Sequence, residues 1–266
     1  MDSRGHSGYV LTEEVRLRYL RYGRGEPAIV VVPGISQPAI TWEFVALELA
    51  ASNAVYVLDP RGRGSSGRPE TGYTLIDYAR DLAAVVNGLG LRRPVILGHS
   101  MGARIAAAFG ALNHGLAGSS ILVDPPLSGP DREPFPVPLD TYLDALHAAQ
   151  AGATAEDMRP FFPTWTDDQL AVRAESLSTC DERAIVETYR GFNDEDFHSY
   201  WRVLSPPVLL MYGAESNIVS ENEIPELRRL NPDARFVRVP GAGHVIPWDN
   251  LQGFLAPIRG FIGALG

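Results

Sequence analysis

Residues 94–112 read PVILGHSMGARIAAAFGAL. The stretch opens with a short apolar run typical of a buried strand and closes with a helical pattern rich in small residues. Between them lies GHSMG (98–102), which fits the G-x-S-x-G pattern of a nucleophile elbow, a sharp turn from strand to helix. Gly98 and Gly102 leave room for that turn, and the N-terminal dipole of the helix faces the same site. The stretch therefore predicts that Ser100 is a nucleophile held in a strained conformation.

The alternation of strand and helix continues on both sides of this stretch. Apolar runs at 28–34, 54–60, 119–126 and 207–213, and a more polar run at 235–241, predict strands. Alternating residues at 15–20 predict a half-exposed strand near the sheet edge. Helical patterns occupy 39–52, 73–90, 101–112, 222–230 and 249–265. This order predicts an α/β fold with a mostly parallel sheet, whose sites gather at the carboxyl ends of the strands.

One long segment lacks clear strands. Residues 127–203 begin with a proline-rich stretch and continue with amphipathic helical patterns and many aromatic residues. An irregular segment of this length inside a compact domain is usually functional. We expect a helical cap at 127–203, inserted into a core formed by 1–126 and 204–266.

Composition and charge restrict the partners. The chain has 266 residues, a net charge of −9 and a single cysteine, Cys180, which has no internal disulfide partner. The acidic balance argues against nucleic acids and anionic membrane surfaces.

The polar N-terminus and the lack of a run of about 18 apolar residues predict a cytoplasmic protein with no membrane partner. Neither metal-ligand spacing nor a phosphate-binding loop is present, so we expect no cofactor and a small-molecule substrate. The oligomeric state is left open.

A serine hydroxyl needs a base and donors for the developing oxyanion. His244, in VPGAGHVIPW (239–248), follows the last predicted strand, and glycines at 241 and 243 let its loop turn inwards. His99 is expected to face away from the site. The oxyanion hole is expected to use the backbone N–H groups of Met101, which follows the nucleophile, and of Ile35, in the loop after an early strand.

These motifs resemble those of the α/β-hydrolase superfamily with a helical cap, along essentially the whole chain. The resemblance implies an eight-stranded, mostly parallel sheet flanked by helices. It also includes DPRGRGSS (59–66), where Asp59 more often organises the turn than acts in catalysis. The chain departs from many relatives at Pro33-Gly34, where they carry His-Gly.

The acid that orients the histidine is not where many members of this superfamily carry it. The loop after strand 207–213 reads AESN, and its turn places Ser216 in the usual aspartate position. Glu215 lies in the same loop and remains the main rival. Asp249 follows the histidine but is expected to cap a helix.

Asp124 is the favoured acid. It ends the strand before the cap, next to the predicted elbow strand, and Pro125-Pro126 fixes an extended exit. Some superfamily members use this earlier strand end, and the order Ser100, Asp124, His244 keeps the superfamily's order of nucleophile, acid and base.

Within the superfamily, the segments GHSMGARIA, ILVDPP and GAGH are similar to those of the N-formylmaleamate deformylases of nicotinate degradation. That resemblance implies attack of Ser100 on a formyl carbon and a substrate carboxylate that needs a cation or hydroxyl. Four arginines of the cap segment are candidates for that contact: Arg159, Arg173, Arg183 and Arg190. A carboxylesterase or C–C bond hydrolase, and a non-catalytic ligand sensor on the same scaffold, remain open as alternatives.

Overall fold

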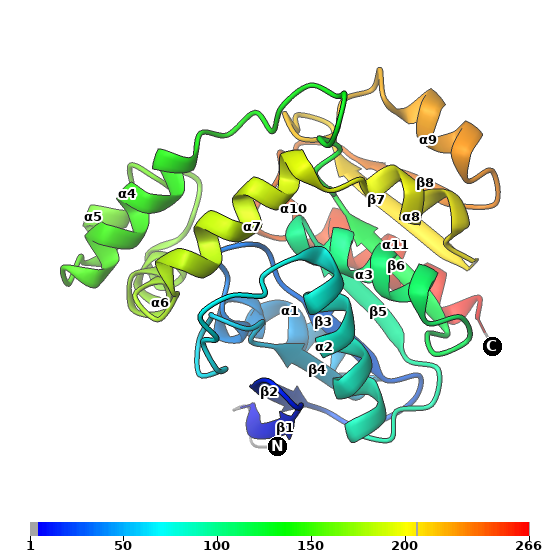
Figure 1. The fold of residues 1–266 in the computed structure, drawn as a ribbon, viewed down its shortest axis with the longest axis horizontal. Coiled ribbons are helices and arrows are strands. Elements are labelled where there is room, and N and C mark those ends of the chain that lie inside the picture. The colour runs from blue at the N-terminus through cyan, green and yellow to red at the C-terminus, as the bar shows by residue number, and fades with distance from the viewer. Residues whose placement is uncertain (1–4, 206, 266) are drawn as a thin grey trace.

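A computed structural model describes residues 5–205 and 207–265 of the chain. Eight strands form one sheet in the order β1-β2-β4-β3-β5-β6-β7-β8 (Figure 1). β2 pairs antiparallel with both of its neighbours, and the other pairings are parallel. The strands are β1 (His6–Leu11), β2 (Arg16–Tyr22), β3 (Ile29–Val32), β4 (Val55–Leu58), β5 (Val95–His99), β6 (Ser119–Val123), β7 (Val208–Gly213) and β8 (Arg235–Val239).

Helices cover both faces of the sheet because the central strands are apolar on both sides. Every residue of β3 and β5 is buried. Val30 and Ile96 join one hydrophobic cluster, whereas their neighbours Val31 and Leu97 join the other. The first cluster includes α2 (Leu75–Gly88), α3 (Met101–Leu112) and α9 (Ile224–Leu230). The second includes η1 (Ala39–Trp42), α1 (Glu43–Leu49), α10 (Ile246–Asp249) and α11 (Leu251–Gly263).

Five helices lie between β6 and β7, within the segment 127–203, which we call the insertion. They are α4 (Leu139–Gln150), α5 (Ala155–Met158), α6 (Asp167–Leu177), α7 (Glu182–Asp194) and α8 (Phe197–Val203). Helices α4 to α6 project to one side of the sheet, and α7 leads back towards it (Figure 1). α8 packs on α3 and α9, where Trp201 donates a hydrogen bond to the carbonyl of Leu227. The last helix of the insertion therefore belongs to a layer of the core.

The predicted strands and helices match the structure closely, with three differences. The strand β1 has no counterpart among the predicted runs, because its Tyr9 and Leu11 are exposed and give no apolar face. The predicted helix 249–265 is divided at Asn250, and α11 continues through Pro257. The predicted helix 39–52 begins with a 3₁₀ turn. No helix of the described residues has the length and apolar character needed to cross a bilayer.

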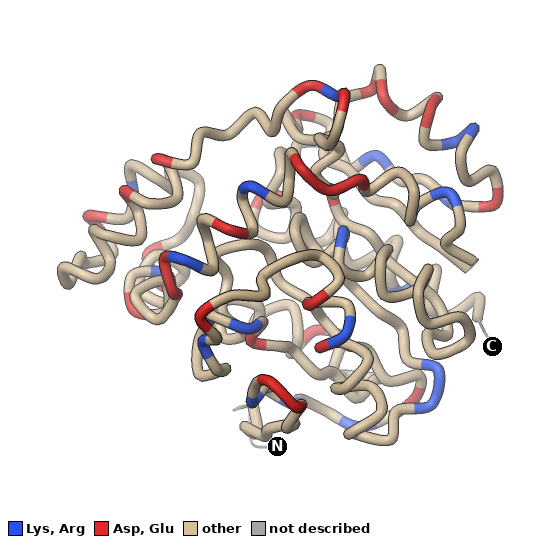
Figure 2. The backbone as a smooth tube through the Cα atoms, viewed as in Figure 1, with Lys and Arg blue, Asp and Glu red and all other residues tan. Residues whose placement is uncertain are grey.

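Charged residues are interspersed over the sheet core and the insertion (Figure 2). Acidic and basic positions often lie close together along the tube. Acidic residues outnumber basic ones in the sequence, which gives the net charge of −9.

Candidate active site

Ser100 lies at the tip of a strained turn between β5 and α3. Its φ of 55° and ψ of −119° are unusual for a residue with a side chain. Such a conformation costs about 1–3 kcal/mol and persists only where the surroundings enforce it. A Cβ on Gly98 would collide with the carbonyl oxygen of Gly102, and one on Gly102 would collide with that of Val32. The two glycines therefore allow the elbow that the sequence predicts.

His244 reaches Ser100 from the loop after β8. Its Nε2 lies 3.0 Å from Ser100 Oγ. Two hydrogen bonds from backbone N–H groups hold this loop: Gly243 N donates to the side-chain Oδ2 of Asp249 over 2.9 Å, and Glu215 N donates to Ala242 O over 2.9 Å. The side chain of His244 is 20% exposed, so solvent or a ligand can reach its imidazole.

Asp124 meets the other side of the same imidazole. Its Oδ2 lies 2.7 Å from His244 Nδ1, and the carboxylate is fully buried. Because a carboxylate only accepts hydrogen bonds, Nδ1 carries the proton. Nε2 of His244 is then an acceptor that faces the hydroxyl of Ser100. The structure thus brings Ser100, His244 and Asp124 into one hydrogen-bonded chain.

The rival carboxylates lie elsewhere. Glu215 is exposed, and in the described chain its carboxylate makes no hydrogen bond to His244. Asp249 does not cap the following helix as predicted, because Asn250 does so through Gly253 N at 2.8 Å. Asp59 is buried and holds the turn, accepting from Ala39 N and Ser65 N.

The two backbone groups expected to form an oxyanion hole are not engaged elsewhere. Among the described residues, neither Ile35 N nor Met101 N donates a hydrogen bond. Ile35 borders the same cavity as Ser100, and Met101 is the first residue of α3. The Ile35 carbonyl accepts from Arg63 Nε at 2.8 Å, which fixes the orientation of this loop.

A cavity of about 180 Å³ lies beside Ser100, between the sheet core and the insertion. It is smaller than the roughly 300–1,000 Å³ typical of pockets for drug-sized ligands. Most of its lining is apolar or aromatic, and Phe161, Phe162 and Trp165 come from the insertion. Its polar lining residues are Ser36, Gln37, His99, Ser100, Thr141, Tyr142, Arg173 and His244.

His99 is placed differently from the sequence prediction. Instead of facing away, it borders the cavity, and its Nε2 lies 2.9 Å from the His244 carbonyl oxygen. Burial lowers its pKa to about 3, with the nearby His244 adding to the shift. His99 is therefore neutral, and its contact with the His244 carbonyl helps to hold the His244 loop in place. No local pattern could have indicated this contact, because 145 positions separate the two residues.

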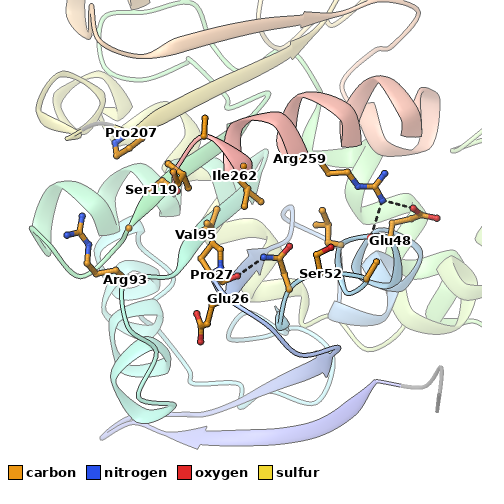
Figure 3. Close-up of a pocket in the computed structure, with 17 residues that line it drawn as sticks. Glu26, Pro27, Glu48, Ser52, Arg93, Val95, Ser119, Pro207, Arg259 and Ile262 are labelled. Atoms are coloured by element: carbon orange, nitrogen blue, oxygen red, sulfur yellow. Dashed lines mark hydrogen bonds and ion pairs between the residues drawn. The ribbon is translucent and has the colours of Figure 1, made fainter.

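A larger cavity lies far from this chemistry. It measures about 1,030 Å³ and lies at the amino ends of the strands, beside residues such as Pro27, Val95 and Ser119 (Figure 3). An ion pair between Arg259 and Glu48 crosses one side of it. Catalytic groups of parallel sheets gather at the opposite, carboxyl ends. The smaller cavity at Ser100 is therefore the candidate active site.

Residues 27–251 match the model of the alpha/beta hydrolase fold family. The chain belongs to the α/β-hydrolase family. An N-formylmaleamate deformylase from Pseudomonas putida is 44% identical over 256 residues, which cover 96% of each chain. The crystal structure of an N-formylmaleamic acid deformylase from Pseudomonas putida S16 superimposes with a TM-score of 0.92. Its sequence identity is 37%, with 95% of this chain and 100% of that chain covered.

A second α/β hydrolase is also similar over most of the chain. The 2-(acetamidomethylene)succinate hydrolase of Mesorhizobium japonicum is 30% identical over 257 residues, with 90% of this chain and 88% of that protein covered. The crystal structure of an E-2-(acetamidomethylene)succinate hydrolase has a TM-score of 0.83 at 26% identity. It covers 97% of this chain and 99% of that one. The chain is thus similar to two kinds of hydrolase over nearly its whole length.

Proposed function

We propose that this α/β hydrolase removes the formyl group of N-formylmaleamate in nicotinate catabolism, yielding maleamate and formate. The observation that carries the proposal is the hydrogen-bonded chain Ser100–His244–Asp124 beside a small cavity. The choice of substrate is based on the similarity to two deformylases of Pseudomonas putida. One is 44% identical in sequence, and the other, whose crystal structure has the same fold, is 37% identical.

In this mechanism Ser100 is the nucleophile. His244 Nε2 takes its proton while Oγ attacks the formyl carbon, and Asp124 stabilises the resulting imidazolium. The tetrahedral intermediate collapses as the C–N bond breaks, and His244 gives its proton to the departing nitrogen. Maleamate leaves, and Ser100 carries the formyl ester. Water then attacks this ester with His244 again as the base, which releases formate and restores the serine hydroxyl.

Met101 N and Ile35 N stabilise the oxyanion in both steps. Neither group has another acceptor among the described residues, so both remain available to the developing charge. A preorganised donor of this kind contributes about 10²–10³ in turnover. The N-terminus of α3 adds a favourable dipole at Met101.

The insertion, apart from α8, serves as the cap of this site, and α8 packs on the core formed by 1–126 and 204–266. The aromatic residues Phe161, Phe162 and Trp165 of the insertion line the cavity that Ser100 also borders. A wall of this kind restricts water and large acyl groups. The small volume therefore suits a one-carbon acyl group on a compact leaving group.

Formate release from N-formylmaleamate, compared with hydrolysis of a panel of small esters, tests the proposal. We expect the purified protein to turn over the formyl imide with the highest kcat/KM, and Ser100→Ala to abolish turnover. A higher kcat/KM for larger acyl esters would favour a carboxylesterase. Ligand binding without any turnover would point to a sensor and contradict the proposal.

A further inference from the structure

Arg173 is a buried cation that borders the candidate active site. It lies on α6 of the insertion, is 3% exposed, and lines the cavity that contains Ser100. Its guanidinium donates to Ser36 O and, over 2.7 Å, to Ser36 Oγ. It also lies 4.8 Å from the centre of the Phe162 ring. Arg173 thus joins the insertion to the loop that carries Ile35 N.

No carboxylate compensates this charge within the described chain. The ion pairs of the described residues include none with Arg173, and its Nε is buried without a hydrogen-bond partner there. Burial lowers the pKa of Arg173 to about 10, with Cys180 and Tyr142 opposing the shift, so the group is still charged at neutral pH. Burying an unpaired charge is costly. A bound anion would remove that cost.

The other arginines considered for this role are placed differently. Arg159 forms ion pairs with Glu156 and Asp167 on the surface. Arg183 and Arg190 are exposed and do not line the cavity. Among the described residues that line the cavity, Arg173 is the one with a permanent charge.

We propose that Arg173 is the receptor for a carboxylate on the substrate, which orients the scissile acyl group towards Ser100. A guanidinium has five N–H donors, so the bonds to Ser36 leave others free for a carboxylate. Tyr142, on α4, lines the same cavity and adds a hydroxyl to its polar lining. The inference rests on the proposed hydrolase function. It widens the expected substrates from a formyl imide to small anionic acyl compounds as a class.

A matched pair of esters tests this inference separately from the deformylase proposal. Monomethyl maleate carries a carboxylate, whereas dimethyl maleate does not, and both offer the same ester bond. We expect the wild type to have the higher kcat/KM for the monoester. In Arg173→Met this preference should fall by about 10–100-fold, the range for a lost hydrogen bond to a charged group. Arg173→Lys should restore part of it.

Arg159→Met is the control, because it removes an arginine of the same insertion that lies outside the cavity. It should keep the wild-type preference. An equal loss on both esters in Arg173→Met would show that Arg173 only supports Ser36, and would overturn the inference. A wild-type preference for the neutral diester would also overturn it.

The two proposals fail in different ways. If N-formylmaleamate is not a substrate but the monoester preference depends on Arg173, the deformylase proposal fails and the carboxylate receptor stands. If Arg173→Met does not fold, inhibition of the wild type by maleamate is compared with inhibition by the neutral maleic diamide. Stronger inhibition by maleamate would support the receptor, and stronger inhibition by the neutral compound would contradict it.

Discussion

Ser216 donates its hydroxyl proton to Asp124 Oδ2 over 2.6 Å, at the same oxygen that accepts from His244. Ser216 occupies the loop position where related hydrolases often carry the acid. Its hydroxyl also accepts from Ile218 N at 3.0 Å, and Gly213 N donates to Asp124 Oδ1 at 3.1 Å. Ser216, in the usual acid position, therefore donates a hydrogen bond to the carboxylate of Asp124, which follows the neighbouring strand.

Asp124→Asn should lower kcat by roughly 10³–10⁴, because an amide cannot stabilise the imidazolium and can impose the wrong tautomer on His244. Glu215→Gln is the matched control, since its side chain is exposed in the neighbouring loop. It should retain nearly wild-type turnover. Steady-state rates of formate release check both variants, and a severe loss confined to Glu215→Gln would refute the role of Asp124.

Ser216→Asp should partly restore the activity of Asp124→Asn. The new carboxylate stands in the loop position beside residue 124, and the amide introduced at position 124 can donate a hydrogen bond to it. In the wild-type background the same substitution should lower kcat, because two adjacent carboxylates cannot both ionise without cost. Rates of the single and double variants form the measurement. A double variant no faster than Asp124→Asn would show that residue 216 cannot reach the imidazole.

Arg63→Met should lower kcat by about 10–100-fold with little change in KM. Arg63 is buried, and its Nε orients the Ile35 carbonyl, next to the proposed oxyanion donor. It also donates to the Thr188 hydroxyl on α7 at 3.1 Å, so its loss removes one of the links between this loop and the insertion. Because an oxyanion donor acts in the transition state, the effect belongs to kcat. An increase in KM alone would contradict this reading, and circular dichroism checks that the variant is folded.

Stability should decrease between pH 6.5 and about 4, in part because of His198. Burial lowers its pKa to about 4; Arg132 and Arg104 lower it further, whereas Glu226 and Asp196 oppose the shift. As the pH falls, His198 is therefore protonated at a higher pH in the unfolded chain than in the folded protein. The unfolding free energy should drop by about 1 kcal/mol per pH unit in that window, less than the full linkage value because of solvent screening.

In His198→Asn, the unfolding free energy should depend less on pH between pH 6.5 and 4. Above pH 7 its dependence on pH should match that of the wild type. Urea unfolding at several pH values measures the difference. An unchanged slope between pH 6.5 and 4 would rule out His198 as a source of the acid sensitivity.

Local patterns in the sequence were enough for the elbow and most of the sheet. GHSMG encodes a strand-to-helix turn because only small residues fit at Gly98 and Gly102, where backbone atoms from neighbouring segments approach. Fully apolar runs such as IVVV indicate strands covered on both faces. The exposed strand β1 was not predicted because its sequence shows no regular alternation of apolar residues.

Tertiary structure alone decided which groups meet at the site. Asp124 reaches His244 because β6 lies between β5 and β7, which brings residues 120 positions apart into one hydrogen bond. Arg173 could not be distinguished from the other arginines of the insertion, since the sequence does not encode which of them is buried without a carboxylate. Through local sterics and apolar periodicity, the sequence by itself predicts Ser100 as nucleophile, His244 as base and the strands that carry them. The sequence favours Asp124 over Glu215, but the hydrogen bond from His244 to Asp124, the burial of Arg173 at the cavity and the contact of His99 with the His244 loop depend on long-range packing.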